Sequence, residues 1–118
     1  MRLVCESITD DDKGVELTLR EQVKPEESQC RIAKRIKVLF DPVVAYRNVD
    51  ESYRTRTFDN HRSREGALFI VQNSEWISWL HSESYGMYEG ARFTHYAIFT
   101  LNDCIDVVSE FEPSVSWI

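Results

Sequence analysis

Residues 67–100 constrain the fold more than any other stretch, because they hold eight of the fourteen aromatic residues of the chain. Each buried aromatic side chain removes roughly 150–250 Å² from water. The stretch begins with a continuous apolar run at 68–71, which is typical of a buried strand. It returns as a second apolar segment at 93–100. We therefore expect a strand–helix–strand unit here, and we expect it to form the nucleus of the core.

A helix is predicted between these two strands, over about residues 74–83. Asn73 and Ser74 can cap the free N–H groups of a helix start, and Glu75 suits the first turn. Gly86 and Gly90 then bracket a turn. At 100° per residue, four apolar residues fall within one broad arc, as a core-facing helix requires. The residues of this arc are Trp76, Ile77, Trp79 and Leu80.

The N-terminal third predicts a β-hairpin. Val15, Leu17 and Leu19 alternate with polar residues, and this period of two indicates a half-buried strand. The Asp- and Gly-containing stretch 10–14 is a turn, which would pair this strand with a first strand at 2–9.

Three further apolar segments fit either a strand or a short helix: 31–40, 43–47 and 103–110. We prefer a strand for 43–47 because it is rich in β-branched and aromatic residues. Residues 48–66 are polar, Arg-rich and poorly periodic, and they are expected to form a loop.

These patterns predict an α+β fold in a single domain over residues 1–118. A parallel sheet would need alternating strands and helices, and that rhythm is absent. We expect a mainly antiparallel, strongly curved sheet of five to seven strands with one principal helix near 74–83. Residues 115–118 would add a terminal strand that returns Trp117 to the core.

The composition, 42% apolar and 29% charged, is that of a soluble globular domain. No apolar run approaches the ~20 residues of a transmembrane helix. The N-terminus is charged too early for a signal peptide. Cys5, Cys30 and Cys104 are an odd number at wide spacings, which favours reduced thiols in a cytoplasm.

Charge is unevenly distributed along the chain. Residues 31–64 carry nine cations against four acids, whereas residues 65–118 carry one cation against eight acids. Such asymmetry can steer a charged partner, although it is also compatible with an ordinary solvated surface. The net charge of −6 and the lack of a basic–aromatic motif disfavour nucleic-acid binding.

No catalytic, metal-binding or nucleotide-binding motif stands out in the sequence. His61, His81 and His95 are isolated and have no Cys at a ligand-like spacing. The sequence contains no Gly-x-Ser-x-Gly element, and its four glycines are too scattered for a phosphate loop. We therefore assign no catalytic residue, no metal and no cofactor, and lean against an enzyme.

A Tyr- and Met-rich stretch around 84–90 has the composition of a protein-contact surface. The candidate partner-binding residues are Glu83, Tyr85, Met87, Tyr88 and Glu89. In the alternative interpretation the two tyrosines fold back over the sheet.

The second candidate site is a group of arginines at 47, 54 and 56. Forked guanidinium groups bind phosphate or carboxylate, so Arg47, Arg54 and Arg56 could hold an anionic ligand in a pocket with Tyr46 or Tyr53. The alternative is a surface network of ion pairs with neighbouring acidic residues, each contributing ~0–1 kcal/mol.

Four segments resemble the C-terminal half of small acidic bacterial proteins, some of which are similar to immunity proteins that neutralise toxins by binding them. The segments are 71–76 (VQNSEW), 95–98 (HYAI), 102–108 (NDCIDVV) and 112–115 (EPSV). The resemblance covers about residues 65–118, includes no diagnostic motif and transfers no functional residue.

The leading hypothesis is a non-enzymatic, cytoplasmic protein-binding module, of the immunity type, with a basic toxin as partner. One alternative is an anionic-ligand binder or an enzyme that uses the arginine and tyrosine cluster. The other is a structural or regulatory subunit that self-associates through exposed aromatic residues.

Overall fold

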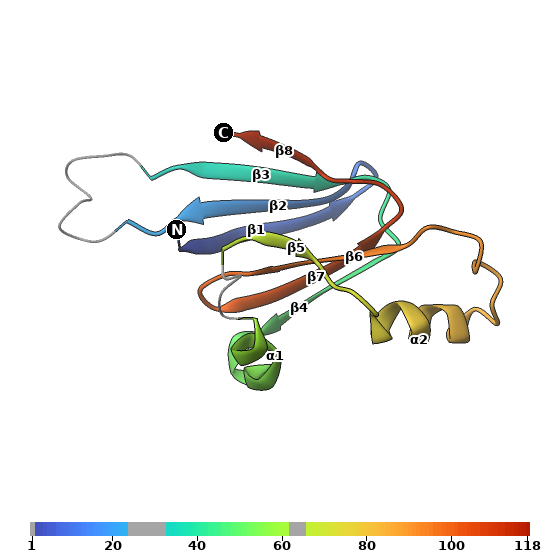
Figure 1. The fold of residues 1–118 in the computed structure, drawn as a ribbon. Helices are drawn as coiled ribbons and strands as arrows, with labels where there is room; N and C mark the ends of the chain where they lie inside the picture. The colour runs from blue at the N-terminus through green and yellow to red at the C-terminus, as the bar shows by residue number, and fades with distance from the viewer. Residues whose placement is uncertain (1, 24–32, 62–65) are drawn as a thin grey trace.

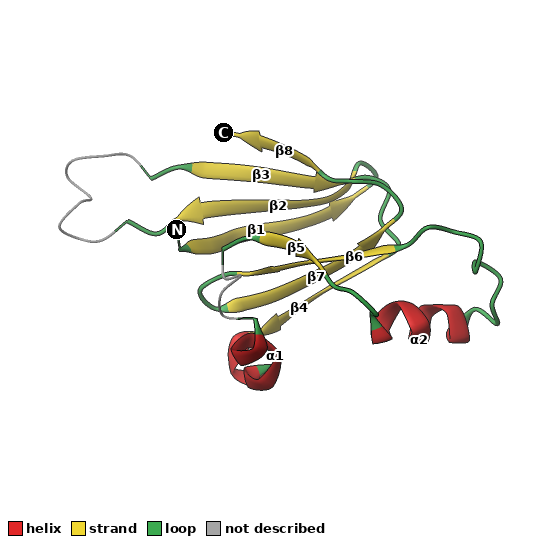
Figure 2. Ribbon diagram, in the orientation of Figure 1, coloured by secondary structure: helices red, strands yellow, loops and turns green. Residues whose placement is uncertain are grey.

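The computed structural model describes residues 2–23, 33–61 and 66–118 and shows an α+β protein with eight antiparallel strands in two sheets (Figures 1 and 2). Sheet A contains, in spatial order, β1 (Leu3–Asp11), β2 (Gly14–Glu21), β3 (Arg35–Phe40) and β8 (Ser114–Trp117). Sheet B contains, in spatial order, β4 (Ala45–Asp50), β7 (Asp103–Ser109), β6 (Thr94–Phe99) and β5 (Leu68–Ile70). The helical elements are η1 (Glu51–Tyr53), α1 (Thr55–Asn60) and α2 (Glu75–Glu83).

The prediction of one sheet with five to seven strands is therefore wrong, whereas the α+β class and the principal helix are confirmed. The ambiguous segments 31–40, 43–47 and 103–110 contribute the strands β3, β4 and β7, because each is paired with a neighbouring strand. Residues 48–66 are not simply a loop, since η1 and α1 lie within them. Cys30, residues 31–32 and residues 62–65 lie outside the described part of the chain.

The predicted hairpin is confirmed, with β1 and β2 paired from Leu3 opposite Glu21 to Asp11 opposite Gly14. Gly14 has a φ of +112°, a conformation that other residues rarely adopt. A Cβ atom there would lie only 2.1 Å from the carbonyl oxygen of Phe40. Glycine thus allows the turn to close against the end of β3.

The main core lies between the two sheets, which form successive layers in Figure 1. From sheet A it receives fully buried side chains such as Val15, Leu17 and Phe40. From sheet B it receives Ile105 and Tyr96, whose ring lies 5.5 Å from that of Phe40. Apolar burial between the sheets is the principal source of stability, at about 25 cal/mol per Å².

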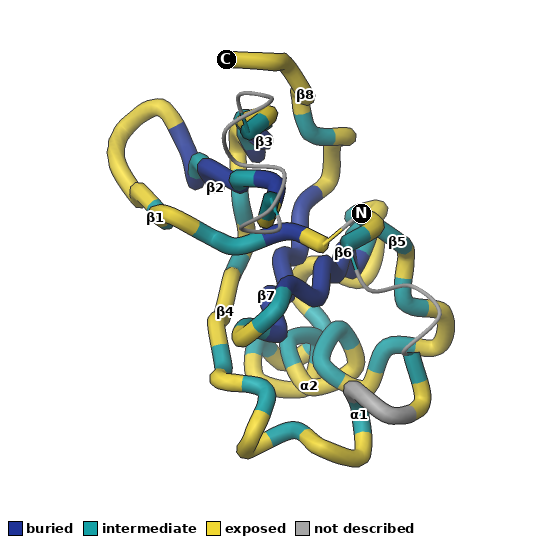
Figure 3. The backbone as a smooth tube through the Cα atoms, turned by 90° about the vertical axis from the view of Figure 1, so that its left-hand side faces the viewer, coloured by how far each residue is buried: buried dark blue, intermediate teal, exposed yellow. Residues whose placement is uncertain are grey.

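The helices lie on the opposite side of sheet B, away from sheet A (Figures 1 and 3). A smaller apolar cluster of Ala97, Phe99 and Cys104, with Phe69 packed against it, covers this outer face. The helices and this cluster therefore cover only part of the outer face of sheet B.

Helix α2 begins where the sequence predicts, with Ser74 as its N-cap. It does not cover the core, because none of its residues is buried. Trp79 remains 55% exposed, so the prediction that it faces the sheet is wrong. Trp117 is 65% exposed on β8 and likewise does not return to the core. No helix in the described ranges has the length and apolar content needed to span a membrane.

Candidate functional site

The candidate site lies on the outer face of sheet B, where strand alternation gathers polar side chains. On β7, Ile105 and Val107 belong to the core between the sheets, so Asp106 projects to the other face. Arg47 of β4 is the direct cross-strand partner of Asp106. His95 of β6 is opposite Val108, two residues beyond Asp106, and therefore lies diagonally across from it.

A continuous hydrogen-bonded chain links this face to the start of α2. The Oγ atom of Ser74 lies 2.7 Å from Nδ1 of His95, and Nε2 of His95 lies 2.6 Å from Oδ1 of Asp106. His95 and Asp106 are buried, with 5% and 1% exposure. Ser74 also accepts a hydrogen bond from the N–H of Ile77 at 3.1 Å, as the helix cap.

Two arginines pair with the other oxygen of Asp106. Nε of Arg47 lies 3.0 Å from Oδ2, and Nη1 of Arg54 contacts the same oxygen. The guanidinium of Arg47 also lies 4.5 Å from the centre of the Trp76 ring, a cation–π contact with α2. Asp106 is thus the shared acceptor that joins β4, β6 and the segment before α1.

These contacts set the charge state of Asp106. Burial by itself raises the pKa of the carboxyl group, but the hydrogen bond from His95 and the charges of Arg54 and Arg47 act in the opposite direction. The net result is a pKa below the ordinary value of 3.8. Asp106 is therefore a carboxylate at neutral pH, and it can only accept hydrogen bonds.

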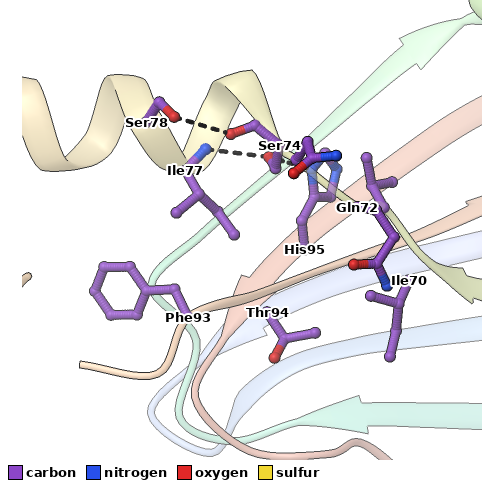
Figure 4. A pocket seen from close by; sticks show the side chains of 10 residues that line it. Ile70, Gln72, Ser74, Ile77, Ser78, Phe93, Thr94 and His95 are labelled. Carbon is purple, nitrogen blue, oxygen red and sulfur yellow. Dashed lines mark hydrogen bonds between the residues drawn. The ribbon is translucent and has the colours of Figure 1, made fainter. Parts of the chain in front are cut away.

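Two hollows meet at Ser74 and His95. The relay pocket, of about 320 Å³, lies over the polar network and is lined by Ser74, His95, Asp106, Arg47, Arg54 and Trp76, among others. The side groove, of about 500 Å³, lies between β5, α2 and the start of β6. Its lining includes Ile70, Gln72, Ile77 and Phe93 as well as Ser74 and His95 (Figure 4).

The structure brings together only part of the predicted anion site. Arg47 and Arg54 share Asp106 and line the relay pocket, whereas Arg56 is exposed on α1 and does not line it. Tyr46 and Tyr53 are 37% and 84% exposed and do not line it either. The positive charge of the arginine pair is partly neutralised by Asp106.

Sequence reasoning did not predict that Ser74, His95 and Asp106 meet in one hydrogen-bonded network. The signal available was Asp106 itself, an acidic residue inside the apolar run of β7 at 104–108. A buried carboxylate needs partners. The three residues are 21 and 11 positions apart along the chain, so only the strand register identifies them as neighbours.

The predicted partner-binding residues form an exposed surface on α2 and the following turn. We define the acidic–aromatic surface as Trp79, Glu83, Tyr85, Met87, Tyr88 and Glu89. Tyr85 is 99% exposed, Met87 75% and Tyr88 53%, so these tyrosines do not fold back over the sheet. Tyr85 has a φ of +54°, in the left-handed region that aromatic residues seldom adopt.

Among the residues that the structure describes, no three His, Cys, Asp or Glu side chains are grouped so that they could hold a metal ion. No protein-family model, curated protein or solved structure matches this chain.

Proposed function

We propose that the protein is a binding module for a basic protein partner and that it binds through the acidic–aromatic surface. The observation that carries this proposal is the exposure of Tyr85, Met87, Tyr88 and Trp79 on one continuous segment, α2 and its following turn. Aromatic and Met side chains are enriched in the cores of protein interfaces, where their burial supplies most of the affinity.

The backbone of Tyr85 fixes how its side chain is presented at the end of α2. A non-glycine residue at a φ of +54° costs about 1–2 kcal/mol relative to a right-handed conformation. The conformation closes the C-terminus of α2, since the N–H of Tyr85 donates to the carbonyl of Ser82 at 3.2 Å and the N–H of Gly86 donates to that of His81 at 2.8 Å, and these hydrogen bonds offset the cost. The cap leaves the side chain of Tyr85 99% exposed, where a partner can reach it.

The charges of the surface favour a basic partner. Glu83 and Glu89 belong to the surface, and Glu75 extends it, because Glu75, Trp79 and Glu83 are spaced four residues apart and form one row along α2. None of the ion pairs within the described part of the chain involves Glu75, Glu83 or Glu89. Free carboxylates beside exposed aromatic rings would accelerate encounter with Lys- and Arg-rich surfaces.

A toxin neutralised by an immunity-type partner fits this chemistry, and it is the partner class that the resemblance of residues 65–118 implies. Binding at this surface requires no catalysis. We place the interaction in the cytoplasm because the odd number of cysteines favours reduced thiols.

Affinity capture from lysate of the source cell, at low and moderate salt, tests the proposal. Wild-type protein should retain a basic partner less well as the salt concentration rises, because exposed charges are screened. Tyr85→Ala should abolish capture. The control Tyr53→Ala should not, because Tyr53 is also a highly exposed tyrosine, at 84%, but lies on η1 outside the surface.

A second pair of variants isolates the role of charge. Glu83→Gln should reduce capture at low salt, whereas the control Glu110→Gln, at an exposed position outside the surface, should not. Equal capture by Tyr85→Ala and wild type would refute the proposal. A mass that increases with concentration in light scattering, and that Tyr85→Ala abolishes, would show instead that the partner is a second copy of the chain.

A small anionic ligand in the relay pocket is the second candidate function. The observation that favours it is Arg47, which lies over Trp76 at the pocket wall and stays 41% exposed despite its pairing with Asp106. Titration with phenyl phosphate should quench tryptophan fluorescence in wild type and not in Arg47→Gln. The same quenching in both proteins would exclude this site.

A further inference from the structure

We propose that Ser74 is the nucleophile of an acyl-transfer site that hydrolyses carboxylic esters with an apolar acyl group. The observation behind it is the hydrogen-bonded order Ser74–His95–Asp106 at the junction of two hollows. The proposal does not depend on the acidic–aromatic surface or on a protein partner.

Ser74 occupies a position suited to a nucleophile. It lies in a strand–turn–helix segment between β5 and α2, and the residue before it, Asn73, has a φ of +53°. Its Oγ accepts a hydrogen bond from the N–H of Ile77 at the start of α2. This hydrogen bond and the positive end of the helix dipole both stabilise an alkoxide on Ser74. Ser74 lines both hollows, so a substrate can reach it.

The hydrogen-bond donors and acceptors make His95 a general base. Asp106 is ionised and can only accept, so Nε2 of His95 must carry the proton that points to Oδ1. When the ring carries only that proton, Nδ1 is the acceptor of a hydrogen bond from the Ser74 hydroxyl, 2.7 Å away. In the serine protease triad, Nε2 of the histidine faces the serine and Nδ1 faces the aspartate, whereas in this protein Nδ1 faces Ser74 and Nε2 faces Asp106. The serine is still the nucleophile, the histidine the base and the aspartate the group that orients the histidine. Arg47 and Arg54 hold Asp106 in place, so it acts as a positioning residue for His95.

The two hollows indicate the substrate class. The side groove offers Ile70, Ile77 and Phe93 for an apolar acyl chain (Figure 4). On the other side of Ser74 the relay pocket offers Arg47 and Trp76 for the alcohol part of the ester. A substrate that spans both would place its ester carbonyl at the junction, beside Oγ of Ser74.

The reaction balances without a cofactor. Oγ of Ser74 adds to the ester carbonyl carbon as its proton moves to Nδ1 of His95, and a tetrahedral intermediate forms. The bond from that carbon to the alkoxy oxygen then breaks, and the alkoxy oxygen takes the proton from Nδ1 and leaves as an alcohol. Water, deprotonated by Nδ1, adds to the acyl-enzyme, and the proton returns to Oγ of Ser74 as the carboxylic acid departs.

The test is covalent labelling of the full chain with an alkyl fluorophosphonate, followed by intact mass measurement and peptide mapping. Wild type should gain one phosphonyl group, on Ser74. Ser74→Asp and Ser74→Gly should lose the label, because both residues are accepted as helix caps but lack the hydroxyl. Ser82→Ala, which changes an exposed serine of α2 that lines neither hollow, should label as wild type does. Thermal melts identify the variants that remain folded.

Rates and substrate preference complete the test. His95→Gln should lower the labelling rate by roughly 10²-fold or more, the range for loss of a general base. Hydrolysis of 4-nitrophenyl octanoate should exceed that of the acetate in kcat/KM by at least about tenfold, because the groove binds the longer chain. Absence of labelling in wild type would overturn the proposal, as would labelling that persists in folded Ser74→Gly or maps to another residue.

Discussion

The two faces of sheet B are built from the same strands but are covered in different ways. On the inner face, Ile98, Ile105 and Val107 pack against sheet A in a continuous apolar core. On the outer face, His95 and Asp106 form a polar network that contacts the start of α2. The inner face therefore supplies most of the stability. The outer face holds polar groups in place by pairing them, although burial by itself would disfavour them.

The largest effect is expected from the inner face. Phe40→Ala removes a fully buried ring that contacts Tyr96 between the sheets, and it should lower the free energy of unfolding by about 3–5 kcal/mol. Denaturant unfolding followed by far-ultraviolet circular dichroism measures this loss. A loss below about 1 kcal/mol would mean that the sheets are not held together by this core.

The next largest effect is expected from the polar network. Asp106→Asn removes the charge that pairs with Arg47 and Arg54 and that is hydrogen-bonded to His95, and breaking such a buried pair costs about 3 kcal/mol. Asp12→Asn, in the exposed β1–β2 turn, is the matched control and should stay within about 0.5 kcal/mol. Equal stability of the two variants would mean that the polar network does not stabilise the fold.

Acid unfolding gives an independent view of the same residue. The pKa of Asp106 in the folded protein lies below its ordinary value of 3.8, so its contribution to stability is present above that value. The contribution is lost as the pH falls below 3.8 towards the folded-state pKa. Denaturant melts between pH 6 and pH 2.5 should therefore show a steeper acid decline for wild type than for Asp106→Asn, and parallel curves would contradict the assignment.

A moderate effect is expected where the helix joins the outer face. Ser74→Ala removes both the cap of α2 and the link to His95, and it should cost about 1–2 kcal/mol. Ser78→Ala, one turn further along α2, should cost less than about 0.5 kcal/mol. If the two variants are equally stable, the network does not anchor the helix.

The smallest effects on stability are expected from the acidic–aromatic surface. Trp79 is 55% exposed, so Trp79→Ala should change the free energy of unfolding by no more than about 1 kcal/mol, far less than truncation of a core aromatic residue. Tyr88→Ala should behave in the same way. Chemical denaturation of both variants beside Phe40→Ala checks this ranking, and a Trp79→Ala loss above 3 kcal/mol would place α2 in the core after all.

Local sequence patterns predicted individual elements well. The alternation of Val15, Leu17 and Leu19 located β2, and the Asp- and Gly-rich turn located its hairpin with β1. The capping signal at Ser74 and Glu75 located the start of α2. These features depend on residues within a few positions of each other, so the sequence contains all that decides them.

Solvent exposure was harder to predict, as Trp79 shows. A helical wheel places it beside Trp76, yet Trp76 contacts His95 and Arg47 whereas Trp79 faces solvent. The number of helix residues that contact a sheet depends on how closely the sheet approaches the helix. Helix α2 meets sheet B mainly at its N-terminal end. Periodicity gives the direction of a side chain but not the presence of a surface opposite it.

By itself, the sequence determined an antiparallel α+β protein with a capped helix after an apolar strand, because hydrogen bonding, capping and alternation are local. Only the tertiary structure decided that the strands divide into two sheets and that Asp106 meets His95, Ser74 and two arginines. The physical reason is register: pairing of β7 with β4 and β6 sets which residues are neighbours across the sheet, and a shift of one residue would turn Asp106 into the apolar core.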